Sequence, residues 1–72
     1  MERADAINVL KELINQRIVQ LLFVTLLRNE HGKYDVLIRG DCDTIELRAF
    51  LAGKNLVLFE DKEKKTFRIY RP

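Results

Sequence analysis

The stretch IVQLLFVTLL, residues Ile18–Leu27, holds eight large apolar residues out of ten, and its conformation decides the fold. As a strand it would be apolar on both faces, which is typical of a strand covered on two sides. As a helix it would be apolar nearly all round, which also requires burial. Its β-branched residues favour a strand, and so does the sequel, in which the polar connection RNEHGK leads into the alternating segment YDVLIRG. We therefore predict a β-hairpin of Ile18–Arg28 and Tyr34–Arg39.

The segment before this hairpin, RADAINVLKELINQ, has the spacing of an amphipathic helix. Its apolar residues recur at intervals of three and four, and its charged residues lie off that face. The pattern predicts a helix that starts near Arg3 and ends near Asn15 or Arg17.

The segment DCDTIELRAFLAGKN is open to two interpretations. Helix signals are present at both ends, with Asp43 at the N-cap position, Glu46 three residues later and Gly53 as a stop. Residues Thr44–Ala49 also alternate with the period of two that is typical of a strand. We prefer the helix, because both of its ends carry their own stop signals.

The last segment, NLVLFEDKEKKTFRIYRP, predicts a second hairpin. Apolar residues lead into a charged turn, after which Phe67 and Ile69 alternate with Arg68 and Tyr70. The order is then helix–hairpin–helix–hairpin, a loose repeat of two αββ units. We predict a single small α+β domain over residues 1–72, with an αββαββ fold in which two hairpins form one four-stranded antiparallel sheet and two helices pack on one face.

At 72 residues the chain is near the lower size limit at which one core stabilises a fold unaided. Cys42 is the only cysteine, so no internal disulfide can form, and one cysteine with one histidine cannot build a four-ligand zinc site. Association with another chain is the remaining way to stabilise so small a fold. The apolar run is too short to span a bilayer and nothing resembles a signal peptide. We expect a cytoplasmic protein without a membrane partner.

Few residues are candidates for catalysis or metal binding. His31 lies in the predicted hairpin turn, and Cys42 has no recognisable nucleophile signature around it. Asp41, Asp43 and Glu46 bring three carboxylates together, but Asp43 is expected to cap a helix, and the segment does not match a calcium-binding loop. The three glycines are isolated, so there is no phosphate-binding loop. We therefore expect no enzymatic activity, no cofactor and no metal site.

The apolar stretch favours self-association. In a sheet with helices on only one face, a strand that is apolar on both faces keeps one face uncovered. That face carries Leu21, Phe23 and Leu27, or else Leu22, Val24 and Leu26, depending on the side that the helices take. We expect a homo-oligomer, most simply a homodimer, that acts as a protein–protein adaptor or regulator. The predicted interface residues are Val19, Leu21, Phe23 and Leu27. The alternative is a central strand that its own chain covers.

A second hypothesis is a nucleic-acid-binding regulator that uses the basic C-terminal hairpin. Basic residues fill the turn and alternate with aromatic and apolar residues on the last strand, so the hairpin can follow a phosphate backbone while a ring stacks on a base. The acidic residues of the same turn also fit a simple charged edge hairpin. The residues of this hypothesis are Lys62, Lys64, Lys65, Arg68 and Arg71.

Two family resemblances bear on the second hypothesis. DTIELRAFLAGKNLVLFEDKEKKTFRIY resembles the recognition helix and wing of a winged-helix DNA-binding domain. This resemblance implies that Thr44–Ala52 enters the major groove and that the Lys62–Lys65 turn contacts phosphate. It also implies helices at Ile18–Arg28 and at YDVLIRG. FLAGKNLVLFED is similar to the part of the Sm-like RNA-binding fold in which a phenylalanine precedes an Asn-Leu-Val-Leu strand, and it implies RNA binding.

Overall fold

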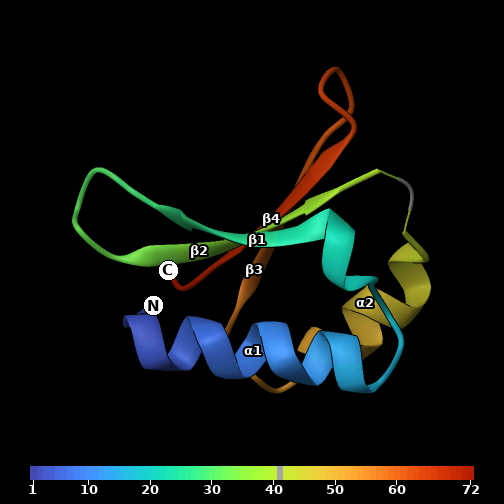
Figure 1. The fold of residues 1–72 in the computed structure, drawn as a ribbon, viewed down its shortest axis with the longest axis horizontal. Helices are drawn as coiled ribbons and strands as arrows, with labels where there is room; N and C mark the ends of the chain where they lie inside the picture. Colours follow the sequence, from blue (N-terminus) through green and yellow to red (C-terminus); the bar gives the residue numbers. More distant parts are fainter. Residues whose placement is uncertain (41) are drawn as a thin grey trace.

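The computed structural model describes residues 1–40 and 42–72, which form two helices and a four-stranded antiparallel sheet in the order αββαββ (Figure 1). The predicted α+β fold is therefore confirmed. The elements are α1 (Arg3–Asn15), the short 3-10 turn η1 (Leu21–Phe23), β1 (Val24–Arg28), β2 (Tyr34–Arg39), α2 (Thr44–Leu51), β3 (Val57–Asp61) and β4 (Thr66–Tyr70).

The two hairpins lie side by side in one sheet, whose strand order is β1-β2-β4-β3. Within the first hairpin, Val24 lies opposite Ile38 and Arg28 lies opposite Tyr34. The two hairpins are joined by β2 and β4, in which Ile38 lies opposite Phe67. In the described part of the chain, β1 and β3 are therefore the two edges of the sheet, and the turn of the β3–β4 hairpin projects away from the helices (Figure 1).

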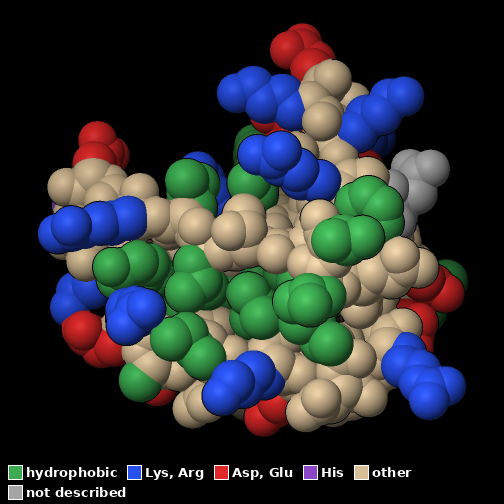
Figure 2. All heavy atoms as spheres, in the orientation of Figure 1, with side chains coloured by type: hydrophobic (Ala, Val, Ile, Leu, Met, Phe, Trp, Pro, Cys, Tyr) green, Lys and Arg blue, Asp and Glu red, His purple; other side chains and the backbone are tan. Residues whose placement is uncertain are grey.

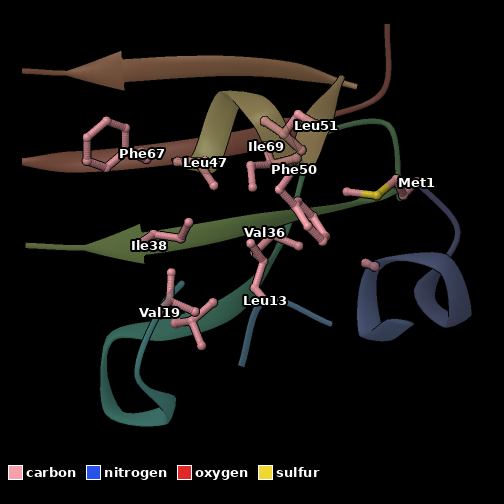
Figure 3. Packing of buried hydrophobic residues seen from close by; sticks show 12 residues of the cluster. Met1, Leu13, Val19, Val36, Ile38, Leu47, Phe50, Leu51, Phe67 and Ile69 are labelled. Carbon is pink, nitrogen blue, oxygen red and sulfur yellow. The ribbon is translucent and has the colours of Figure 1, made fainter. Parts of the chain in front are cut away.

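The core lies between the helices and one face of the sheet (Figure 3). Side chains two residues apart on a strand point to the same face, so β2 and β4 each contribute two buried residues to it. The buried apolar residues of the strands are Val24, Val36, Ile38, Phe67 and Ile69, and the buried helix residues are Ala6, Leu13, Leu47, Phe50 and Leu51. Both helices thus cover the same face, and no other described element covers the opposite one.

The prediction of one strand from Ile18 to Arg28 is wrong in its first half, because β1 begins only at Val24. After α1, Arg17 takes a left-handed backbone conformation with φ +59°, and the N–H of Ile18 donates to a carbonyl in the last turn of α1 over 3.0 Å. These features end the helix in the way that a glycine usually does. They also turn Val19 into the core, where it is 8% exposed. The apolar residues that follow form η1 before the chain enters the sheet.

For the segment DCDTIELRAFLAGKN the helix interpretation is confirmed, because Thr44–Leu51 forms α2, and the strand alternative is wrong. The Asp43 carboxylate accepts hydrogen bonds from the backbone N–H groups of Ile45 and Glu46, at 3.0 and 3.2 Å. This is the geometry of an N-cap. Gly53 follows the helix with φ +77°, which glycine adopts without strain.

Because Asp43 satisfies two backbone donors of α2, we expect Asp43→Ala to lower the free energy of unfolding by about 1 kcal/mol. Urea denaturation followed by far-ultraviolet circular dichroism measures this loss as a lower midpoint with an unchanged slope. Asp43→Asn keeps a capping oxygen and is the matched control, expected to unfold close to the wild-type midpoint. Equal losses in the two variants would contradict the capping role.

Candidate functional site

The uncovered face of the sheet carries the side chains that alternate with the core residues. One row crosses all four strands at paired positions of the register: Thr25 on β1, Leu37 on β2, Arg68 on β4 and Phe59 on β3. Apolar, cationic and aromatic groups therefore meet on this face.

Arg68 is the centre of the uncovered face. Its guanidinium lies 5.6 Å from the centre of the Phe59 ring and 5.4 Å from the centre of the Tyr70 ring, which is the range of a cation–π contact. Its Nε lies 3.7 Å from one carboxylate oxygen of Asp35, a residue that is only 4% exposed. The side-chain amide of Asn29 donates to the other oxygen over 3.3 Å. A buried carboxylate thus holds the guanidinium between two aromatic rings.

Two hollows lie on this face, each of about 490 Å³, and both have Arg68 and Leu27 in their lining. One of them, which we call the basic groove, combines apolar and cationic side chains. Its apolar lining is Leu27, Leu37 and Phe59, and its charged lining is Arg39, Lys64, Lys65, Arg68 and Asp61. Four cations and one carboxylate give this groove a positive charge that the net charge of the chain, +2, does not reveal.

The structure separates the five basic residues that the sequence predicted as a nucleic-acid site. Lys64, Lys65 and Arg68 line the basic groove. Arg71 lines the second hollow, and its guanidinium lies 3.9 Å from a carboxylate oxygen of α1. Lys62 lines a different hollow, together with Phe67, which is buried on the covered face. Only three of the five residues therefore share one groove.

The backbone of Lys65 ties the β3–β4 turn to the end of β2. Its φ is +55°, in the left-handed region that non-glycine residues rarely adopt. Its carbonyl accepts a hydrogen bond of 2.9 Å from the N–H of Gly40. This contact fixes the turn next to Arg39, so that the cations of β2 and of the turn line the same groove.

Sequence reasoning missed Arg39 and Phe59 as members of this groove. The alternation along β2 puts Arg39 on the same face as Leu37, and this could have been predicted from the sequence. The sequence does not show that β2 lies next to β4, which places Arg39 opposite Thr66 and beside the second hairpin. Phe59 joins the groove for the same reason, because it lies opposite Arg68.

The predicted interface residues are also separated. Val19 is buried in the core of its own chain. Leu21 and Phe23 lie in η1, 67% and 49% exposed, next to Leu22, which is 88% exposed. Leu27 lies on β1 and is 40% exposed. Three consecutive apolar residues are thus open to solvent just before an edge strand.

Figure 2 shows how apolar side chains gather around β1. One group forms a band over α1 and the sheet above it, and a second group lies over the turn that precedes β1. The partly buried apolar residues of α1 and β1 that pack against the core are Val9, Leu10, Ile14 and Leu26. We call these residues, together with Leu21–Phe23 and the free edge of Val24–Arg28, the β1 edge surface.

The candidate catalytic residues do not converge. His31 lies in the β1–β2 turn, whereas Cys42 lies in the loop before α2, at the other end of the sheet (Figure 1). Burial, and to a smaller extent the charges of Asp43 and Glu46, raises the pKa of the Cys42 thiol above its ordinary value. A raised pKa disfavours the thiolate that a nucleophile needs.

The predicted carboxylate cluster is only partly described. Asp43 is engaged as the cap of α2, and Asp41 lies outside the described residues. Residues 1–40 and 42–72 contain no group of three His, Cys, Asp or Glu side chains placed to hold a metal ion. In the same residues, no helix has the length and apolar character that crossing a bilayer requires.

No protein-family model, curated protein or solved structure matches this chain. The winged-helix resemblance is wrong, because YDVLIRG forms the strand β2 where that family requires a helix. In the Sm-like resemblance Phe50 precedes a strand, and that strand is present as β3, but Phe50 itself is buried within α2. Neither resemblance therefore assigns a binding residue.

The raised pKa of Cys42 predicts slow alkylation of the folded protein by iodoacetamide near neutral pH, because only the thiolate reacts. Mass spectrometry of the alkylated chain should place the pH midpoint of the folded state above that of the urea-unfolded chain. The contribution of the buried thiol to stability is complete below the unfolded-state pKa and is lost as the pH rises through the folded-state pKa. Glu46→Gln removes one of the neighbouring charges and should speed the reaction slightly. A folded-state midpoint at or below the unfolded one would contradict the burial argument.

The contact between Arg68 and Asp35 predicts a measurable coupling free energy. Because Asp35 is buried, a double-mutant cycle with Asp35→Ala and Arg68→Ala should give a coupling of about 1 kcal/mol in urea denaturation. The pair of Lys54 and Glu12, at 3.8 Å with both side chains about half exposed, is the matched control. There we expect at most about 0.5 kcal/mol. Equal couplings in the two cycles would show that Arg68 is not anchored.

Proposed function

We propose that this chain is a small non-enzymatic binding module that works as a homodimer, with the β1 edge surface as its interface. The observation that carries the proposal is an unpaired edge strand, Val24–Arg28, whose first four residues are uncharged and which directly follows the exposed residues Leu21–Phe23. A strand edge offers unpaired backbone groups to another strand, and a contiguous apolar patch adds area to such a contact.

The other edge of the sheet is protected in the way that monomeric proteins protect their edges. β3 ends in Glu60 and Asp61, so an added strand would meet two carboxylates. In β1 the only charged residue is Arg28, at the last position of the strand. Of the two edges that the described residues form, β1 is therefore the one suited to pairing.

A second copy fits this edge in an antiparallel arrangement about Leu26. In that register Thr25 meets the partner's Leu27, and Val24 meets the partner's Arg28. No like charges then lie opposite each other, which in a sheet would be destabilising. The two copies would form one continuous sheet, in which Leu26 lies at the two-fold axis and the exposed residues of η1 lie toward the β1–β2 turn of the other copy.

The energetic terms permit such a dimer. Full burial of a Leu or Phe side chain contributes about 1.5–3 kcal/mol, and Leu21–Phe23 with Leu27 supply four partly or fully exposed ones. Association of two chains costs at least about 4 kcal/mol in lost freedom. The free energy gained by burying these four residues is large enough to offset that cost, and backbone pairing along β1 adds to the gain.

The biological role that fits this geometry is that of an adaptor or regulator. The same edge can accept a strand from a different protein by strand addition, which is a common mode of peptide recognition. A free, partly buried thiol at Cys42 fits a reducing cytoplasmic compartment.

The proposal predicts a particle of twice the chain mass of 8.5 kDa at tens of micromolar in sedimentation velocity. Leu22→Glu adds a charge at the most exposed apolar residue, and Thr25→Lys adds one to the edge itself. Each should weaken association by at least about tenfold. Thr25→Lys places two like charges beside the two-fold axis, and Leu22→Glu places a carboxylate near Glu30 in the β1–β2 turn of the other copy.

Phe59→Ser is the matched control, because it removes an exposed apolar ring from the other edge strand and should leave the dimer intact. A wild-type protein that stays monomeric at these concentrations would refute the dimer. A dimer that Phe59→Ser dissociates and Leu22→Glu does not would move the interface to β3.

A further inference from the structure

The basic groove on the uncovered face lies apart from the core and largely apart from the β1 edge surface, with Leu27 as the only shared residue. It is bounded by β2, β3, β4 and the turn between β3 and β4. Its volume of about 490 Å³ is in the range of ligand-binding sites, about 300–1,000 Å³. This groove therefore has room for a ligand of its own.

The charge of the groove favours an anionic ligand. Arg39, Lys64 and Lys65 are exposed there, and none of them has a carboxylate partner within ion-pair distance in the described residues. The one lining carboxylate, Asp61, is engaged locally, because it accepts a hydrogen bond of 3.1 Å from the N–H of Lys64. Three cations thus remain available for phosphate groups.

The aromatic groups of the face favour flat ligand groups. The ring of Phe59 is half exposed in the groove, and Tyr70 lines the second hollow on the other side of Arg68. The guanidinium between the rings is held by Asp35 and contacts both rings, so it helps to fix their positions. Base stacking on aromatic and guanidinium groups is how proteins bind single strands without reading their sequence.

Single-stranded nucleic acid is the ligand that uses both features. A duplex offers its phosphates but keeps its bases stacked inside, out of reach of a ring that lies on a sheet. An acidic peptide offers carboxylates but has no regular series of flat groups to place on Phe59 and Tyr70. We propose that the uncovered face binds single-stranded nucleic acid, with phosphates at Arg39, Lys64 and Lys65 and with bases stacked on Phe59 and Tyr70.

Fluorescence anisotropy with labelled dodecamers of deoxythymidine and of uridine tests this proposal at low salt. Both single strands should bind, and the logarithm of the association constant should fall against the logarithm of salt concentration with a slope of about −2 for three phosphate contacts. The two oligonucleotides distinguish DNA from RNA as the preferred strand.

Two kinds of variant separate charge from stacking. Lys64→Gln with Lys65→Gln should weaken binding by at least about tenfold and flatten the salt slope to about −0.7, since one phosphate contact remains. Phe59→Ala should weaken binding by about five- to a hundredfold and leave the salt slope unchanged, since a base loses its stacking partner. Both changes are at exposed positions, and circular dichroism checks that the variants fold.

Lys62→Gln is the matched control, because Lys62 belongs to the same turn but lines a different hollow. It should bind like the wild type. The proposal is overturned if neither single strand binds at low salt, if Phe59→Ala binds as well as the wild type, or if Lys62→Gln weakens binding as much as the double change. Equal affinity for a duplex of the same length, or equal competition by polyglutamate, also overturns it.

Discussion

The pairing of β2 with β4 is the constraint on which the rest of this structure depends. Each αββ unit by itself has one helix and a two-stranded hairpin, which is marginally stable in water. The pairing sets Ile38 beside Phe67 in the core and Leu37 beside Arg68 on the opposite face. The hydrophobic core and the basic groove therefore both arise where the two units meet, on opposite faces of the same pair of strands.

The elements that carry their own local signals could be predicted from the sequence, and those that depend on distant contacts could not. Asp43 and Gly53 mark the ends of α2, and alternation marks β2 and β4. The end of α1 near Asn15 was predicted, but the start of β1 was placed too early. A non-glycine residue, Arg17, takes the left-handed conformation after α1, so the apolar residues that follow it resembled the start of a strand. The groove was only partly predicted, because the order of strands brings Arg39 to the second hairpin and no local pattern encodes that order.

Two helices are enough to cover one face of a four-stranded sheet, and this limit explains both candidate surfaces. The uncovered face is made compatible with water by charge, since Arg68 lies over a buried carboxylate and over two rings that would otherwise be more exposed. The β1 edge has no comparable protection, and its neighbours in η1 are apolar. One surface is thus polar and pre-organised by side-chain contacts, and the other is apolar and open to a partner.

Lys65 has a left-handed backbone conformation, and this sets the stability of the turn against the anion binding that we propose for the basic groove. Glycine would adopt this backbone without the strain of about 1 kcal/mol that a lysine side chain imposes. The same replacement would remove a cation from the basic groove. Selection for thermal stability alone would favour glycine at this position, whereas selection for anion binding would retain lysine. Under the proposed binding of single strands, position 65 would therefore lose stability and gain affinity from the same lysine.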